Sequence, residues 1–217
     1  MSSSLPILIF DLDDTLIRSF PSYAASHQRV AGDLGWEVPT IPELVPYGRD
    51  WADTLSRLFP DRNVEAFMRR YDEIAHEHPY DALPGALEAL TEVRRRGHSL
   101  YIVTKRDRTR LAARLAEAGI DQGLFEGIFP RESQPAPKPD PRCFEPVWAA
   151  IGIPHGAALS PLPIYVGDRE EDRLAATSAG IEFVAVLTGP EASVGFPRDL
   201  DGSNILGSIA ELPRWLE

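Results

Sequence analysis

Short apolar runs alternate with amphipathic segments along most of the chain. The runs rich in branched and aromatic residues predict five strands, over Leu5–Phe10, Ser99–Thr104, Gly127–Phe129, Ile164–Val166 and Ile181–Leu187. Helices are predicted over Pro84–Arg96, from Asp107 to Gly119, from Asp140 to Gly152, over Arg169–Ala179 and near Ile205–Ala210. Pro146 predicts a kink or a late start in the third of these helices. This alternation is typical of an α/β fold with a parallel sheet.

Residues 18–82 interrupt the alternation. This segment contains no convincing strand, and its periodicity predicts helices over Ser22–Leu34, Trp51–Phe59 and Val64–His76. A helical insert between the first strand and the next α/β unit explains the break. We therefore expect a core domain made of residues 1–17 and 83–217, with an all-helical domain at 18–82 inserted into it.

Composition narrows the class of protein. The chain has 217 residues, of which 43% are hydrophobic and 25% charged, as in a globular protein. No run approaches the roughly 20 apolar residues of a membrane span. The single cysteine, Cys143, excludes an internal disulfide and a multi-cysteine metal site. The net charge of −11 disfavours a nucleic acid or an anionic membrane as partner. We expect a cytoplasmic protein, either a monomer or a homodimer.

Carboxylates follow two of the predicted strands. Asp11, Asp13 and Asp14 come directly after the first strand, and Asp168 and Asp172 after the fourth. Ligands of open α/β sheets bind beyond the carboxyl ends of the strands. Clustered carboxylates repel one another unless a cation is present, and Mg²⁺ prefers oxygen ligands. A metal site is one interpretation; helix caps and an acidic turn are the other.

Two further side chains belong to the same sheet edge. Thr104 ends the second predicted strand, where its hydroxyl can bond an anionic oxygen. Lys138 lies in a proline-rich loop just before a predicted helix. Of the 22 basic residues only Lys105 and Lys138 are lysines, and the rest are arginines. In a chain that otherwise uses arginine, a lysine is a stronger indication of a functional role, because the two side chains are not interchangeable. Lys138 is therefore a candidate partner for a phosphate or a carboxylate.

Taken together, these residues resemble the four motifs of the haloacid dehalogenase-like hydrolase superfamily. The motifs are Asp11-Leu12-Asp13-Asp14-Thr15, Thr104, Lys138 and Gly167-Asp168-Arg169-Glu170-Glu171-Asp172. The resemblance covers essentially the whole chain and is strongest to the phosphoglycolate phosphatase-like branch, whose small helical cap follows the first motif. It implies a Rossmann-like parallel-sheet core and identifies the insert at 18–82 as the cap.

The resemblance also implies catalytic roles. Asp11 would be the nucleophile that forms an aspartyl-phosphate, and Asp13 the general acid and then the base. Thr104 would bind the transferring phosphoryl group, and Lys138 would stabilise Asp11 and the phosphoryl oxygens. True dehalogenases lack an acid at the position of Asp13, so its presence favours phosphate chemistry.

A Mg²⁺ ion is implied by the same motifs. Its site would be made by Asp11, the main-chain carbonyl of Asp13, and Asp168. Asp172 would act there directly or through a neighbouring ligand. The ion, Lys138 and main-chain amides would supply locally the positive charge that the acidic chain lacks overall.

The sequence indicates the residues that contact the substrate less clearly than it indicates the catalytic residues. Arg18 at the entrance to the cap, Arg49 within it and Lys105 after Thr104 are the candidates. We expect a Mg²⁺-dependent phosphatase of a small phosphorylated metabolite, such as phosphoglycolate. The alternatives are a phosphomutase or another phosphoryl transferase, and a module that binds a phosphorylated ligand without turnover. Tyr23 falls where the sugar-phosphate mutases of this superfamily carry a histidine, which disfavours the mutase.

Overall fold

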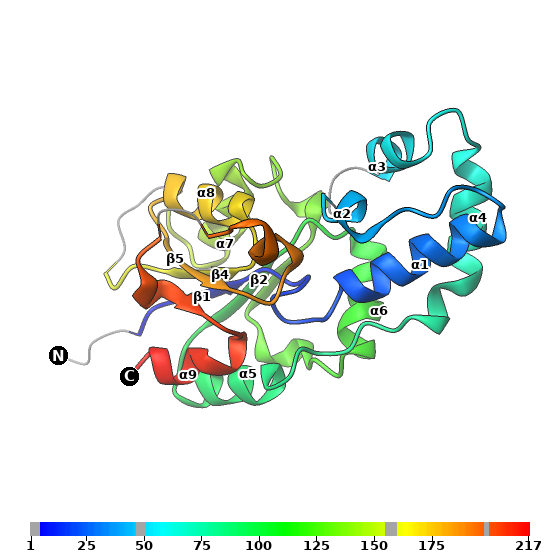
Figure 1. Ribbon diagram of the computed structural model, residues 1–217. Coiled ribbons are helices and arrows are strands. Elements are labelled where there is room, and N and C mark those ends of the chain that lie inside the picture. Colours follow the sequence, from blue (N-terminus) through cyan, green and yellow to red (C-terminus); the bar gives the residue numbers. More distant parts are fainter. Residues whose placement is uncertain (1–4, 47–50, 155–159, 198–199) are drawn as a thin grey trace. The chain divides into compact units, whose positions relative to one another are not determined.

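The chain divides into two compact units. The computed structural model describes residues 5–46, 51–154, 160–197 and 200–217. One unit is Met1–Arg18 with Asp81–Glu217, and the other is Ser19–Tyr80. The first contains the sheet and the second is helical (Figure 1). The predicted α/β class, a parallel sheet with a helical insert, is confirmed.

All six strands of the described residues form one parallel sheet, in the order β3-β2-β1-β4-β5-β6. The strands are β1 (Leu8–Phe10), β2 (Leu100–Val103), β3 (Gly127–Phe129), β4 (Ile164–Gly167), β5 (Glu182–Val186) and β6 (Ile205–Leu206). β1 lies in the middle, with Phe10 opposite Ile102 on one side and Val166 on the other. The carboxyl ends of β1, β2 and β4 are therefore neighbours.

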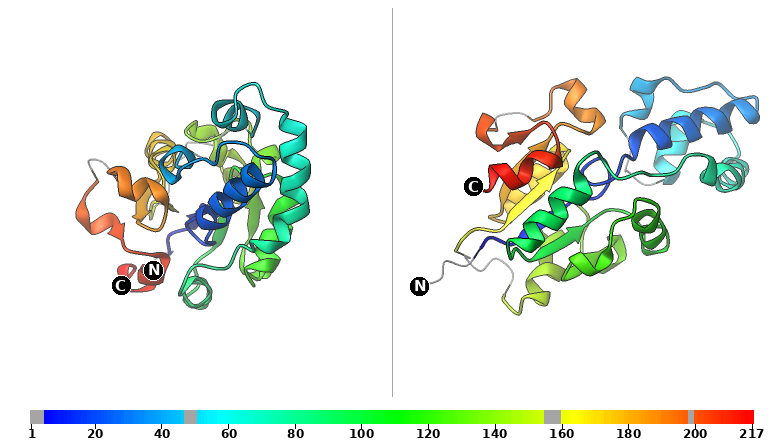
Figure 2. Two further views of the ribbon diagram at one scale, coloured as in Figure 1. Left: turned by 45° about the vertical axis from the view of Figure 1, so that its right-hand side comes forward. Right: turned by 90° about the horizontal axis from the view of Figure 1, so that it is seen from below.

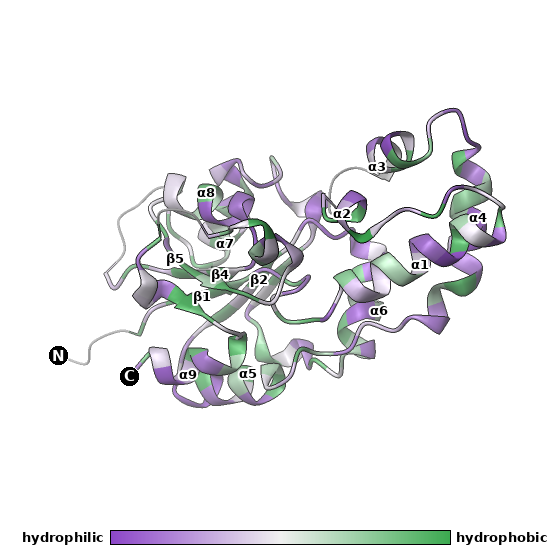
Figure 3. Ribbon diagram, viewed as in Figure 1, coloured by the Kyte–Doolittle hydropathy of each residue, from purple (hydrophilic) through white to green (hydrophobic). Residues whose placement is uncertain are grey.

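The central strands are buried on both faces, which explains their nearly continuous apolar sequences (Figure 3). Ile9, Tyr101 and Tyr165 face one layer, where they pack with Phe144 and Trp148 of the segment after Lys138. Residues alternate between faces along a strand, so their neighbours in sequence face the opposite layer.

Helices are described in both units. They are α1 (Phe20–Asp33), α2 (Ile41–Leu44), α3 (Trp51–Leu58), α4 (Val64–Ile74), α5 (Ala86–Arg95), α6 (Arg108–Glu117), α7 (Glu145–Ala150), α8 (Glu170–Ser178) and α9 (Leu212–Trp215). Two of them begin at a side chain that caps the helix, and one of these, Asp107, begins a helix that the sequence predicted. Asp107 caps α6 by accepting the Arg110 backbone N–H at 2.9 Å, and Asn63 caps α4 in the same way. α7 and α8 cover one face of the sheet, and α5 and α9 lie side by side on the other (Figures 1 and 2).

Two details of the predicted helices are resolved by the structure. The helix predicted near Ile205–Ala210 is wrong at its start, because Ile205 and Leu206 form β6 against Ala185 and Val186. Helical turns begin only at Ile209. The expected irregularity at Pro146 is a late start: the chain forms a 3-10 turn over Pro141–Phe144 before α7.

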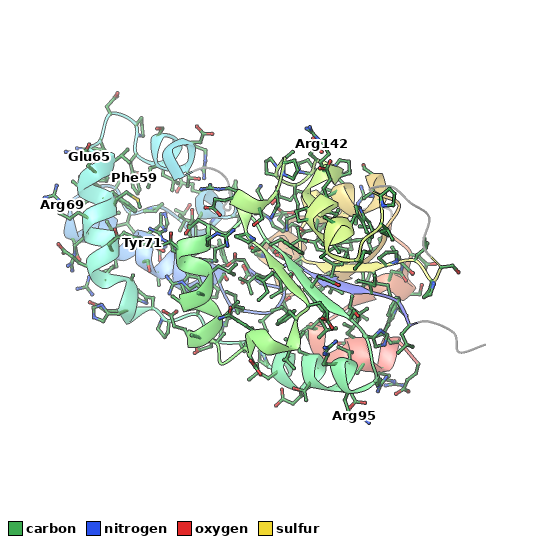
Figure 4. All side chains as sticks on the ribbon, turned by 180° about the vertical axis from the view of Figure 1, so that it is seen from behind. Phe59, Glu65, Arg69, Tyr71, Arg95 and Arg142 are labelled. Carbon is green, nitrogen blue, oxygen red and sulfur yellow. The ribbon has the colours of Figure 1, made fainter. Side chains whose placement is uncertain are left out.

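The helical unit has its own hydrophobic core. Phe59, Phe67 and Tyr71 are buried together with Val30 and Leu55. Figure 4 shows Phe59 and Tyr71 pointing into the unit, whereas Glu65 and Arg69 point away from it along the other side of α4. This amphipathic pattern is what the sequence periodicity predicted for α4.

No helix among the described residues combines the length and the apolar character that crossing a bilayer requires.

Candidate active site

Three polar side chains meet at the carboxyl edge of the sheet. Asp11 follows β1, Thr104 follows β2 and Asp168 follows β4, and all three are buried. The backbone continues the sheet pairing at two of these positions: the Asp11 N–H donates to the Val166 carbonyl at 2.9 Å, and the Thr104 N–H to the Phe129 carbonyl at 3.1 Å. Because β1, β2 and β4 are parallel and adjacent, side chains from three distant motifs lie at the same edge of the sheet.

Asp11, Asp168 and Asp172 form a buried carboxylate cluster. One oxygen from each lies within 4.8 Å of those of the other two, as a metal site requires. Burial raises the pKa of Asp11 to about 7; Lys138 opposes this shift, and Asp172 adds to it. Burial, followed by repulsion from Asp172, raises the pKa of Asp168 well above its ordinary value. Both shifts arise mainly from burial, and the closeness of the carboxylates to one another adds to them.

Lys138 is the cation within this cluster. Its Nζ donates to Asp11 Oδ1 at 2.7 Å, to Asp172 Oδ1 at 2.6 Å and to the Tyr165 hydroxyl at 2.8 Å. Burial disfavours the charged amine, but attraction to Asp11 and Asp172 outweighs it and raises the pKa of Lys138. The lysine is therefore held charged with its three donors directed at fixed acceptors.

Tyr165 is a site residue that the sequence analysis did not identify. It lies within β4 and is fully buried, and its hydroxyl donates to Asp172 Oδ1 at 3.1 Å or to the Val103 carbonyl at 3.3 Å. The one available signal was a tyrosine inside an apolar strand, since a buried hydroxyl needs partners. Here those partners are Lys138 and its acids.

The residues present fit a divalent cation of the Mg²⁺ type. Asp168 Oδ2 is buried and has no hydrogen-bond partner among the described residues, while Oδ1 accepts from the Thr15 hydroxyl at 3.3 Å. An unpartnered buried carboxylate oxygen is costly unless a cation binds it. Asp172 differs, because Lys138 and the Arg169 backbone N–H bond its two oxygens.

Glycines make room for these acids. A Cβ atom on Gly189 would lie 1.8 Å from Asp168 Oδ2, and one on Gly167 would lie 2.7 Å from Asp172 Cγ. Gly189 stands after β5, outside the four motifs. Any larger residue there would displace the oxygen that lacks a partner.

The side chain of Asp13 lies outside the carboxylate cluster. Its two oxygens pair with the guanidinium of Arg106: Nε donates to Oδ2 at 3.1 Å, and a terminal nitrogen donates to Oδ1. Asp13 remains 23% exposed, whereas Asp11 and Asp168 are buried. Asp11 and Asp13 of the first motif therefore have different environments.

Backbone hydrogen bonds of Asp14 stabilise the turn after the first strand. This residue has φ 55°, in the left-handed region that aspartate tolerates better than most side chains. Its N–H donates to the Ile17 carbonyl at 2.7 Å, and its own carbonyl accepts the Thr188 hydroxyl at 2.5 Å. The turn directs Asp11 and Asp13 to different partners.

The structure describes two of the three residues predicted to contact the substrate. Lys105 pairs with Glu171 at 2.8 Å, near the first turn of α8. Arg18 is exposed, and its backbone N–H donates to the Asp81 carbonyl. Arg49 lies outside the described residues.

The family model of the haloacid dehalogenase-like hydrolases matches residues 8–186, which is most of the chain. The chain belongs to this family. The expected enzyme class, a haloacid dehalogenase-like hydrolase, is thereby confirmed.

Relatives of this hydrolase carry one name repeatedly. This chain is 28% identical over 204 residues to a phosphoglycolate phosphatase of Pseudomonas savastanoi. The match covers 87% of this chain and 72% of that protein. A plasmid phosphoglycolate phosphatase of Cupriavidus necator is 29% identical, with 98% and 94% covered. A structure described as a predicted phosphoglycolate phosphatase, from Haemophilus somnus, superposes with a TM-score of 0.78 at 24% identity over 100% of both chains. The last comparison shows the shared fold.

Replacing Gly189 with alanine is expected to weaken Mg²⁺ binding to this hydrolase by at least about tenfold, because the new methyl group displaces Asp168 Oδ2. Calorimetric titration with Mg²⁺ checks this. Gly202→Ala is the matched control, since a Cβ there meets nothing within 4 Å. Equal Mg²⁺ affinity in both variants would show that Asp168 does not bind the ion.

Proposed function

We propose that this hydrolase is a Mg²⁺-dependent phosphatase of a small phosphate monoester of the phosphoglycolate type. The observation that carries the proposal is the contact of Lys138 with Asp11, beside the unpartnered oxygen of Asp168. A buried carboxylate next to a fixed ammonium and a cation site is suited to attack on an anionic phosphoryl group. The names of the relatives support the substrate class.

Asp11, Asp168 and the Asp13 main-chain carbonyl are the proposed metal ligands. Asp172 has both oxygens engaged, so its proposed role is to position Lys138 rather than to bind the ion directly. When bound, Mg²⁺ would offset the negative charge of the phosphoryl group.

The proposed reaction has two steps. Asp11 attacks phosphorus, the bond between phosphorus and the ester oxygen breaks, and Asp13, which enters this step protonated, gives that oxygen its proton. Water then attacks the aspartyl-phosphate, Asp13 takes a proton from it, and the bond to Asp11 breaks. Lys138 stabilises Asp11 and the phosphoryl oxygens throughout. Thr104 Oγ1 accepts the Arg106 N–H at 3.1 Å, and its hydroxyl is proposed to donate a hydrogen bond to the phosphoryl group.

The helical unit is proposed to act as a cap. Its inserted position after the first motif and its separate core suit a unit that moves as one body. Such a cap would exclude water and select the leaving group, with Arg18 and Arg49 as proposed contacts.

Phosphate release tests the proposal. With Mg²⁺ the protein is expected to release inorganic phosphate from 2-phosphoglycolate or p-nitrophenyl phosphate, and with EDTA the rate is expected to fall by at least about 100-fold. Colorimetric phosphate measurement and phosphorus NMR of the products are the readouts. A phosphorylated isomer would instead indicate a mutase, and tight binding of phosphate without turnover a binding module.

A further inference from the structure

The first turn of α8 is capped by a residue from another part of the chain. Arg169 stands at the N-cap position of α8, but a guanidinium has no hydrogen-bond acceptor, and its side chain makes no capping hydrogen bond. The carboxylate of Glu191 takes this role, because its Oε2 accepts the Glu170 backbone N–H at 3.0 Å. Glu191 lies in the 3-10 turn Pro190–Val194, which follows β5. The start of α8 therefore depends on a contact with a distant loop.

The same carboxylate also binds the side chain of Arg169. Oε1 of Glu191 accepts from Arg169 Nε at 2.9 Å, and the two side chains are only 21% and 13% exposed. The backbone of Glu191 is fixed in turn, since its carbonyl accepts the N–H of the buried Phe196 at 3.3 Å. Hydrogen bonds between charged groups are stronger than neutral ones. Glu191 is thus a fixed anchor for the backbone at Arg169 and Glu170.

The capped backbone joins the two acids of the fourth motif. Asp168 directly precedes Arg169, and Asp172 lies in the first turn of α8, where its Oδ2 accepts the Arg169 N–H at 3.1 Å. The other oxygen of Asp172 accepts from Lys138 at 2.6 Å. A shift of the Arg169 backbone would therefore change the position of Asp168 relative to Asp172 and Lys138.

The loop that bears Glu191 approaches the proposed metal site as well. Gly189 lies two residues before Glu191, and a Cβ atom on it would be 1.8 Å from Asp168 Oδ2. Thr188 of the same loop donates to the carbonyl of Asp14 at 2.5 Å. One loop thus contacts the first and the fourth motif, and Glu191 attaches this loop to α8.

We propose that Glu191 is a positioning residue for the metal site: it caps α8 and thereby fixes Asp168, which lies next to the start of the helix, in the position that binds Mg²⁺. Both oxygens of Glu191 are engaged, so it acts through the backbone of Arg169 and Glu170 and not on the ion or the substrate. This inference rests on the proposed phosphatase function and adds to it a residue outside the four motifs.

Glu191→Ala tests the inference with three readouts. In protein freed of Mg²⁺ with EDTA, hydrogen exchange measured by NMR is expected to be at least about tenfold faster at the Glu170 amide, which has lost its acceptor. Calorimetric titration is expected to show Mg²⁺ affinity weaker by at least about tenfold. Phosphate release at saturating Mg²⁺ is expected to stay within about threefold of the wild type, because excess ion compensates for the weaker site.

A second variant supplies the cap locally. Arg169→Ser introduces a hydroxyl at the N-cap position, where serine is among the preferred residues. When it is combined with Glu191→Ala, Mg²⁺ affinity is expected to return to within about threefold of the wild type, although the ion pair of Arg169 with Glu191 is absent. Arg169→Ser alone measures the effect of losing the other contacts of the arginine, among them Glu171 at 3.5 Å.

The matched control is Glu132→Ala. Glu132 makes the same kind of contact at another helix, since its Oε2 accepts the backbone N–H of Arg108, the first residue of α6, at 3.0 Å. α6 also has its own cap in Asp107, and the proposed metal ligands lie outside it. Mg²⁺ affinity is therefore expected to stay within about twofold of the wild type. Melting temperatures of all variants verify that they are folded.

Other outcomes decide against the inference in distinguishable ways. Unchanged Mg²⁺ affinity in Glu191→Ala, with or without faster exchange at Glu170, would show that the cap does not position the ligands. A double variant as weak as Glu191→Ala would show that capping is not the cause, and would overturn the inference too. A wild type that binds no Mg²⁺ would overturn the proposed function and this inference together. A wild type that binds Mg²⁺ but releases no phosphate from any ester would overturn the phosphatase function and leave the role of Glu191 standing.

Discussion

Asp11→Asn is expected to reduce Mg²⁺-dependent phosphate release by a factor on the order of 10⁴ or more, the scale seen when a covalent nucleophile is removed. The amide keeps the size of the side chain and can still accept a hydrogen bond from Lys138 Nζ, which lies 2.7 Å from Asp11 Oδ1. It lacks the anionic oxygen that would attack phosphorus. The rate of phosphate release at saturating Mg²⁺ is the measurement, with the melting temperature as a check on folding.

Asp121→Asn is the matched control for this variant. Asp121 is exposed and caps a short turn by accepting the Gly123 N–H at 2.9 Å, which asparagine does equally well. Its activity is expected to equal that of the wild type. If Asp11→Asn kept more than a tenth of wild-type activity, covalent catalysis by Asp11 would be excluded, and another group would have to attack phosphorus.

Lys138→Met is expected to lower the free energy of unfolding by about 3–5 kcal/mol, because it leaves buried charge without a partner. Methionine approximates the length of the lysine side chain but donates nothing to Asp11, Asp172 or Tyr165. For a chain of this size the loss corresponds to a fall in melting temperature of roughly 10 °C. Urea unfolding followed by circular dichroism measures it, and phosphate release is expected to be lost as well.

The only other lysine of the chain provides the comparison. Lys105 pairs with Glu171, and both side chains are more than 20% exposed, at 22% and 23%. Lys105→Met is therefore expected to cost about 1 kcal/mol or less, because solvent screens such a pair. Equal losses in the two variants would mean that Lys138 does not compensate the buried acids, and its proposed role would fail.

Strand ends were predictable from the sequence because they depend on local patterns. A buried parallel strand needs a nearly continuous apolar run, and the polar residue that follows marks its carboxyl end. That reasoning brought Asp11, Thr104 and Asp168 to one edge, and the structure places them there. β6 was missed because two residues carry no periodicity, and pairing with β5 decides their conformation.

Contacts between distant residues could not be read in the same way. Lys138 was predicted to stabilise Asp11, but its contact with Tyr165 depends on the orientation of a side chain inside β4. The approach of Gly189 to Asp168 depends on the path of a loop after another strand. Glycine there resembles any loop glycine until the neighbouring backbone is known.

The sequence by itself determined the class of fold, the sheet edge that carries the chemistry and the acids that lie on it, because apolar runs and their polar ends are local properties. The tertiary structure alone decided the charge pairs that no motif implied. Asp13 and Arg106 are 93 residues apart, and no spacing rule pairs them. Burial and chain packing select such partners, because a buried charge is unfavourable unless an opposite charge lies beside it, and the fold determines which residue that is.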